Sequence, residues 1–173
     1  MKKNSRTDPV SQLCPNCGLC CNGVLFADVE LQKGDDARQL AGLGLSLKKK
    51  GCQRAFAQPC ACFADPICRI YPDRPAYCRA FECGLLKAVQ AGEREAKTAL
   101  TTIAGAKRRV DKVYEILRWF GQNEESTALM ERYSQVMREP VDLSGPEDAV
   151  AMRGKLMHAM EDLMRLLQRD FLR

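Results

Sequence analysis

Ten cysteines are the residues of this chain whose type and spacing point to chemistry, and all ten precede residue 84. In a cytosolic chain, which the cellular thiol pool keeps reduced, such a cluster serves as metal ligands or redox groups rather than as a disulfide framework. We therefore interpret the cysteines first as metal ligands. The first group forms the run Cys14-Pro15-Asn16-Cys17-Gly18-Leu19-Cys20-Cys21.

The spacing of this run is C-x2-C-x2-C-C, and two residues between ligands let a loop turn once and present both sulfurs to one ion. A glycine directly after the second cysteine, as in Cys17-Gly18, resembles a zinc knuckle. The C-x2-C-x2-C spacing also holds iron–sulfur clusters in bacterial ferredoxins. Thiolates are poor ligands for calcium and magnesium, so the ligand type points to zinc or iron, and the spacing alone does not separate these two metals. The C-x3-C-x2-C loop of radical S-adenosylmethionine enzymes does not occur.

The adjacent pair Cys20-Cys21 adds information about the number of metal positions. Neighbouring side chains of an extended segment point to opposite sides, so the pair can serve two metal positions or one polynuclear site. A redox disulfide between adjacent cysteines would close a strained ring, which makes this alternative the less favoured one.

A second block follows in the order Pro59-Cys60, then Cys68-Arg69-Ile70-Tyr71-Pro72-Asp73-Arg74-Pro75-Ala76-Tyr77-Cys78-Arg79-Ala80-Phe81-Glu82-Cys83. Together the two blocks resemble the CxxCxxCC, or YkgJ-like, family of zinc- or iron-chelating proteins over roughly residues 13–86. The resemblance implies eight metal ligands: Cys14, Cys17, Cys20, Cys21, Cys60, Cys68, Cys78 and Cys83. Cys52 and Cys62 lie outside the family pattern, and we expect both to be buried free thiols.

Other residues of the second block have supporting roles in this interpretation. Arg74, Pro75 and Arg79 are expected to fix the loop between Cys68 and Cys83, and the arginines to compensate thiolate charge. Tyr71 and Phe81 are expected to cover the metal from solvent.

Local patterns predict the elements that position the cysteines. We expect a ligand loop over 13–23, short strands at 24–26 and 29–31, and a helix over 35–50 that carries Leu40, Leu43 and Leu47 at helical spacing. Gly51 can end that helix. Four prolines between Cys52 and Cys83 predict irregular backbone over much of that stretch.

The cysteine-free remainder predicts three amphipathic helices. The first spans about 96–120, ends at Gly121, and carries a stripe of Ala96, Ala99, Ile103, Ala106, Val110, Val113, Leu117 and Phe120. The second spans 124–138 with Leu129, Tyr133 and Val136 or Met137 on its apolar side, and ends before Pro140. The third begins at Ser144-Gly145-Pro146-Glu147, a capping sequence, and its stripe is Met152, Leu156, Met160, Leu163, Leu167 and Phe171.

These elements predict a mainly α fold in a single compact domain of 173 residues. A flexible tail over 1–12 is expected to precede an irregular cysteine-rich metal-binding module with few short strands over 13–90. A helical segment over 91–173 is expected to follow, and its methionines are interpreted as core residues rather than as a partner groove.

Composition narrows the classes of partner. The longest apolar runs fall short of a membrane span, and no apolar stretch follows the basic N-terminus as a signal peptide requires, so we expect a cytoplasmic protein without membrane contact. The basic runs Lys48–Lys50 and Lys107–Arg109 are short and lack interleaved aromatics, which disfavours nucleic acid. His158, the single histidine, lies in the last helix beyond every cysteine and is expected to be partly exposed.

The favoured function is a cytosolic metal-binding protein that chelates zinc or iron, or holds an iron–sulfur cluster, through about eight thiolates. Its partners would be the metal ion and a protein that contacts the C-terminal helices. The alternative is an enzyme that uses the cluster, such as a redox protein or one like the protein lysine N-methylases that resemble this family. Neither a catalytic Cys/His pair nor a phosphate loop supports that alternative. Metal storage or delivery is a third hypothesis.

Overall fold

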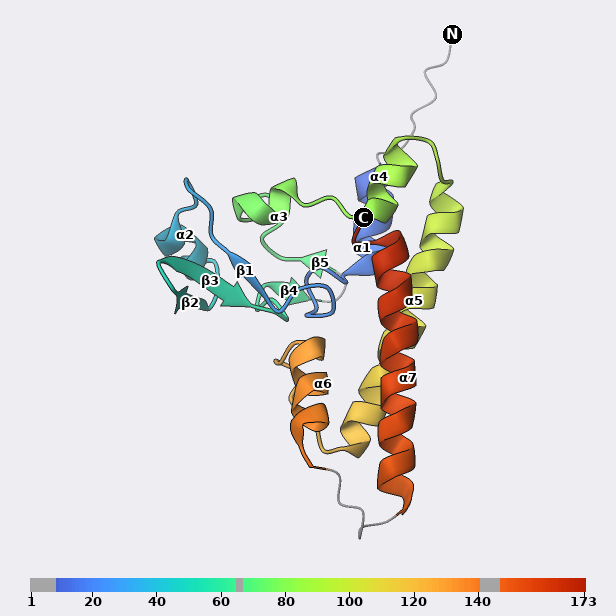
Figure 1. Ribbon diagram of the computed structural model, residues 1–173. Coiled ribbons are helices and arrows are strands. Elements are labelled where there is room, and N and C mark those ends of the chain that lie inside the picture. The colour runs from blue at the N-terminus through green and yellow to red at the C-terminus, as the bar shows by residue number, and fades with distance from the viewer. Residues whose placement is uncertain (1–8, 65–66, 141–146) are drawn as a thin grey trace.

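The computed structural model describes residues 9–64, 67–140 and 147–173 (Figure 1). These residues form a mainly helical fold with a few short strands in one compact chain, as the sequence predicted. The helices are α1 (Pro9–Cys17), α2 (Ala37–Gly42), α3 (Ala76–Ala80), α4 (Gly84–Gln90), α5 (Ala96–Trp119), α6 (Leu129–Arg138) and α7 (Glu147–Asp170). The strands are β1 (Asp28–Glu30), β2 (Leu47–Lys50), β3 (Gln53–Ala57), β4 (Phe63–Ala64) and β5 (Ile67–Cys68).

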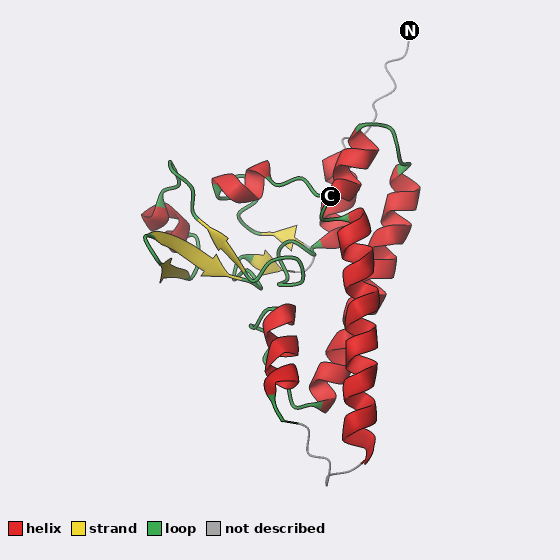
Figure 2. Ribbon diagram, viewed as in Figure 1, coloured by secondary structure: helices red, strands yellow, loops and turns green. Residues whose placement is uncertain are grey.

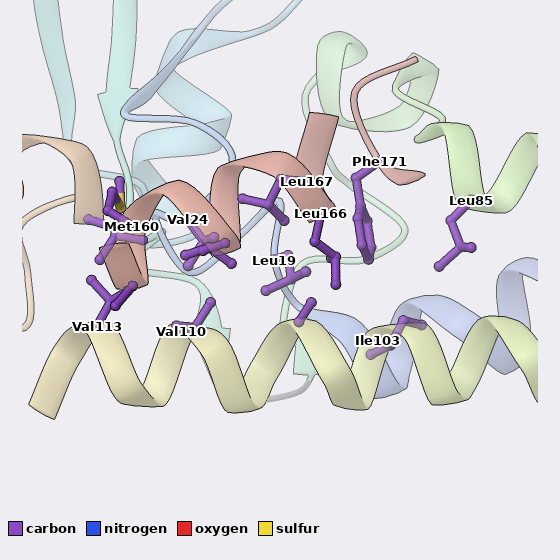
Figure 3. Close-up of a cluster of buried hydrophobic side chains, with 14 of the residues drawn as sticks. Leu19, Val24, Leu85, Ile103, Val110, Val113, Met160, Leu166, Leu167 and Phe171 are labelled. Atoms are coloured by element: carbon purple, nitrogen blue, oxygen red, sulfur yellow. The ribbon is translucent and has the colours of Figure 1, made fainter. Parts of the chain in front are cut away.

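The helical body is built on α5 and α7, which pack along each other (Figures 1 and 2). The predicted stripes of both helices face this contact and form the larger core, part of which is drawn in Figure 3. Its members include Ala99, Ile103, Ala106, Val110, Val113 and Leu117 of α5, and Leu156, Met160, Leu163 and Leu167 of α7, with Phe171 just beyond it. Apolar residues three and four apart lie on one helix face, so the periodicity predicted both helices correctly.

The C-terminal ends of α5 and α6 agree with the sequence signals, whereas the start of α6 does not. Gly121 follows α5 with a φ of +75°, a left-handed conformation that glycine adopts without steric cost. Helix α6 begins at Leu129 rather than at Glu124, and it ends before Pro140 as predicted. The proposed cap of α7, Ser144 to Pro146, lies outside the described residues.

The N-terminal segment corrects two predictions. Helix α1 includes residues 9–12, which were predicted to be part of a flexible tail, and 13–17, which were predicted to be loop. Pro15 lies inside this helix, and Leu13 is buried in the larger core. Packing of α1 against α4 and α5 therefore outweighs the poor helix propensity of this sequence. Residues 1–8 lie outside the described part of the chain.

A small antiparallel sheet of order β1-β3-β2 lies beside the helical body (Figure 2). The predicted helix over 35–50 is wrong in its second half, because only Ala37–Gly42 is helical and Leu47–Lys50 forms an edge strand. Gly44 has a φ of +102°, which a continuous right-handed helix cannot contain. The run of three lysines in β2 is therefore on a solvent-exposed strand rather than on a helix.

The sheet and the loops beside it enclose a second, smaller core of Val29, Leu31, Leu40, Leu45, Phe56, Cys62 and Ile70. Strand β3 is regular for five residues within the stretch predicted to be irregular, because no proline falls between Gln53 and Ala57. Of the two predicted strands, the one at 29–31 corresponds to β1, whereas 24–26 is not a strand. None of the described helices is long and apolar enough to cross a membrane.

Candidate metal centre

The first two predicted ligands, Cys14 and Cys17, lie on the last turns of α1 and pack against the larger core. The chain turns directly after them at Gly18, which has a φ of +72°. A Cβ on Gly18 would lie 2.6 Å from the Phe63 ring. Glycine is therefore required here for both its conformation and its small size, and the turn starts the loop that carries the next two cysteines.

Cys20 and Cys21 lie in this turn, and their sulfur atoms are 3.6 Å apart. The prediction that the two side chains point to opposite sides of an extended segment is wrong, because the Cys21 N–H donates to the Gly18 carbonyl and closes a turn. The Cys60 N–H donates to the Cys21 carbonyl at 2.8 Å. This hydrogen bond joins the first cysteine block to the start of the second.

The second block approaches the first from the side of the sheet. Cys60, Cys68 and Cys78 pack against the smaller core, Cys68 from the end of β5 and Cys78 from α3. Cys83 instead packs against the larger core at the start of α4. The eight predicted ligands therefore come from both sides of the junction between the two cores.

The position of Cys83 is fixed by the end of α7. The N–H of the next residue, Gly84, donates to the Phe171 carbonyl at 2.9 Å. A Cβ on Gly84 would lie 3.2 Å from the Asp170 carbonyl oxygen, so the two backbones approach closely. Asp170 is buried and pairs with Arg94 at 3.0 Å and with Arg169 at 2.7 Å.

A cavity of about 490 Å³ lies at the junction of the two cores. Seven of the eight predicted ligands line it: Cys14, Cys17, Cys20, Cys21, Cys68, Cys78 and Cys83. Cys60 is the eighth and contacts this group through Cys21. Most of the remaining wall is apolar or aromatic, including Leu13, Leu25, Phe26, Val29, Phe63, Leu85 and Phe171. No motif marked these lining residues in the sequence, because packing between distant segments brings them to the cavity.

The two cysteines outside the family pattern do not line this cavity. Cys62 is fully buried in the smaller core, as predicted, and its sulfur donates to the Leu43 carbonyl at 3.4 Å. Cys52 was also predicted to be buried, and this prediction is wrong. It follows Gly51, whose φ is +59°, at the exposed turn between β2 and β3. Gly51 and Cys52 alone connect β2 to β3, and in this short turn the Cys52 side chain is exposed to solvent rather than packed in a core.

The predicted loop-fixing residues take part in local contacts. The Arg74 Nε donates to the Tyr71 carbonyl at 2.9 Å, and its guanidinium lies 3.6 Å from the centre of the Tyr71 ring. Arg79 donates to the Arg74 carbonyl. Phe81 packs edge-on against Phe26 with ring centres 4.9 Å apart. Arg74, Tyr71 and Phe81 all line the cavity, so this loop forms part of its wall.

Burial and mutual repulsion keep most of these thiols protonated. Burial raises the pKa of Cys17 to about 12, and the charges of Cys20, Cys83 and Cys14 act in the same direction. Burial also raises the pKa of Cys60 to about 11 and that of Cys78 to about 12. It raises the pKa of Cys83 as well, although the Leu86 and Leu85 amides at the start of α4 partly offset this effect. Several buried sulfurs this close together need a cation before they can all ionise.

Cys20 and Cys21 behave as a coupled pair. The hydrogen bond from Cys21 lowers the pKa of Cys20 to about 7 against the effect of burial, and the charge of Arg74 lowers it further. The same hydrogen bond raises the pKa of Cys21 above its ordinary range, and burial adds to the increase. The pair therefore loses its first proton near neutral pH and keeps its second to well above neutral pH.

Fold and site together define a mainly helical protein with a thiol-lined cavity between two cores. Among residues 9–64, 67–140 and 147–173, no group of three or more His, Cys, Asp or Glu side chains is arranged to hold a metal ion. His158 is exposed on α7. Comparison of the chain with protein-family models, with curated proteins and with solved structures finds no match.

Proposed function

We propose that this protein binds zinc or iron through the eight thiolates of Cys14, Cys17, Cys20, Cys21, Cys60, Cys68, Cys78 and Cys83. The observation that carries the proposal is the single cavity lined by seven of these cysteines, which belong to segments up to 69 positions apart in the chain. Cys52 and Cys62 do not line it, and Cys60, the one predicted ligand that also does not line it, is hydrogen-bonded through its backbone N–H to the Cys21 carbonyl.

The chemistry of the donor set supports this function. Thiolates are soft ligands suited to zinc and to iron–sulfur clusters, and a bound cation favours their ionisation in a buried site. The sulfurs have to move together when the metal binds, and the flanking turn at Gly18 and the loop from Tyr71 to Phe81 are the segments that would adjust. The resemblance to the CxxCxxCC family supports the same conclusion.

Thiol protection tests the proposal at the level of single residues. The chain is prepared without air, with and without added zinc or ferrous iron, alkylated with N-ethylmaleimide and analysed by peptide mass spectrometry. We expect metal to slow alkylation of the eight cysteines, whereas Cys52, which is exposed, reacts rapidly in both states. Equal alkylation rates of the eight cysteines with and without metal would contradict the proposal.

Matched serine variants complete the test. Cys78→Ser removes a predicted ligand and is expected to reduce the metal content of the purified chain. Cys52→Ser makes the same chemical change at the exposed turn and is expected to leave the metal content unchanged. A loss of metal in both variants, or in neither, would argue against the assignment of ligands.

A further inference from the structure

The eight cysteines divide between the two cores of the protein. Cys14, Cys17 and Cys83 pack against the larger core, whereas Cys60, Cys68 and Cys78 pack against the smaller one. All of these cysteines except Cys60 line the one cavity between the cores. A tetrahedral thiolate site needs four ligands, one more than the cysteines packed against either core supply.

The vicinal pair supplies the missing ligands. Cys20 directly follows Leu19, which is fully buried in the larger core, so the larger core anchors the backbone that leads into Cys20. Cys21 is joined to the other side, because its carbonyl accepts the Cys60 N–H at 2.8 Å. Their sulfurs, 3.6 Å apart, thus lie where the two groups meet.

We infer that the protein holds two separate four-thiolate metal centres, a helix-side centre formed by Cys14, Cys17, Cys20 and Cys83, and a strand-side centre formed by Cys21, Cys60, Cys68 and Cys78. This inference rests on the proposed metal binding and adds the number of centres and the ligands of each. Each centre of four thiolates and one divalent ion carries a net charge of −2. Arg74 lines the same cavity as these cysteines and places a positive charge there.

Three double variants with equal numbers of substitutions test the division. The helix-side pair is Cys17→Ser with Cys83→Ser, the strand-side pair is Cys60→Ser with Cys78→Ser, and the mixed pair is Cys17→Ser with Cys78→Ser. The full-length chains are loaded with zinc, challenged with a chelator, and their retained zinc is counted. We expect two zinc ions in the wild type, one in each same-side pair, and none tightly held in the mixed pair.

The outcomes separate the inference from the function on which it rests. A wild-type chain that retains no metal would refute the proposed function and the inference together. Equal metal loss in all three double variants would overturn the inference alone, because one polynuclear site is damaged equally by any two substitutions. A single iron–sulfur cluster ligated from both sides would also overturn it and leave metal binding intact.

A second measurement needs no variant and so does not depend on the folding of substituted chains. The wild type is loaded with cadmium-113 and examined by NMR. Two resonances of the tetrathiolate type, without coupling between the metals, support two separate centres. One resonance, or two resonances coupled through a shared sulfur, would contradict them, since sulfurs 3.6 Å apart can also bridge two ions.

Discussion

Asp170 stabilises the end of α7 that holds Gly84 and Cys83 beside the cavity. Its side chain is 2% exposed, and its two arginine partners are 33% and 61% exposed. Burial alone would raise the pKa of Asp170, but the hydrogen bonds and charges of Arg169 and Arg94 outweigh it and lower this pKa below its ordinary value. The carboxylate is therefore ionised in the folded protein throughout the neutral range.

Replacement of this carboxylate by the amide of similar shape, Asp170→Asn, removes two ion pairs without creating a cavity. Fully exposed pairs contribute about 0–1 kcal/mol, and removal of one partner of a fully buried pair costs about 3–5 kcal/mol. Because both arginines remain solvated, we expect a loss of about 1–2 kcal/mol in the free energy of unfolding, or about 3–6 °C in Tm for a chain of this size.

Urea unfolding between pH 3 and pH 8 measures this loss and its pH dependence. A carboxyl whose folded pKa is lowered contributes stability above its unfolded pKa and loses it as pH falls through the folded pKa. The difference between wild type and variant should thus be constant from pH 5 to pH 8 and shrink below about pH 4. The control Asp162→Asn removes an exposed ion pair with Arg109 and should cost less than about 0.5 kcal/mol. Equal costs for both variants, or a difference that grows at low pH, would refute the reasoning.

Three further predictions concern the core, the turn and the metal. Leu163→Ala removes a fully buried side chain between α5 and α7, and chemical denaturation should show a loss of about 2–5 kcal/mol in the free energy of unfolding. The control Met157→Ala, at a half-exposed position, should change this free energy by less than about 0.5 kcal/mol. Similar losses in both variants would contradict the assigned core. Gly18→Ala should weaken metal binding at least tenfold in a chelator competition, because the added Cβ would clash with the Phe63 ring and residue 18 has a positive φ. An unchanged metal affinity would show that the turn is not part of the site. Zinc added to weakly buffered protein at pH 7 should release several protons from the cysteine thiols, because burial raises the pKa of Cys17 and of other ligands and keeps them protonated until the metal binds. Uptake of zinc without proton release would contradict thiolate ligation.

The long helices could be predicted from the sequence because their fold depends on local periodicity. Apolar residues every three or four positions over 24 residues specify α5 and α7 without reference to the rest of the chain. Short elements gave no comparable signal. Leu40 and Leu47 are spaced as in one helix, yet the left-handed Gly44 places Leu40 in α2 and Leu47 in β2.

The candidate site shows the same contrast. The resemblance to the CxxCxxCC family pattern implied eight of the ten cysteines as ligands, and seven of those eight line one cavity. Which cysteines lie on which side could not be predicted, because this depends on contacts between distant segments. Cys83 joins Cys14 and Cys17 since the α4 backbone at Gly84 is bound to the end of α7, more than 80 positions away. Exposure of Cys52 likewise follows from the pairing of β2 with β3.

Metal content per chain tests metal binding most directly. The protein is purified without air and without added metal, and zinc, iron and acid-labile sulfide are measured together with the absorption spectrum. We predict at least one tightly held equivalent of zinc or iron per chain: colourless protein if the metal is zinc, and brown protein with sulfide if it is an iron–sulfur cluster. A chain that contains neither metal, and that takes up neither zinc nor ferrous iron with its thiols reduced, would contradict the account.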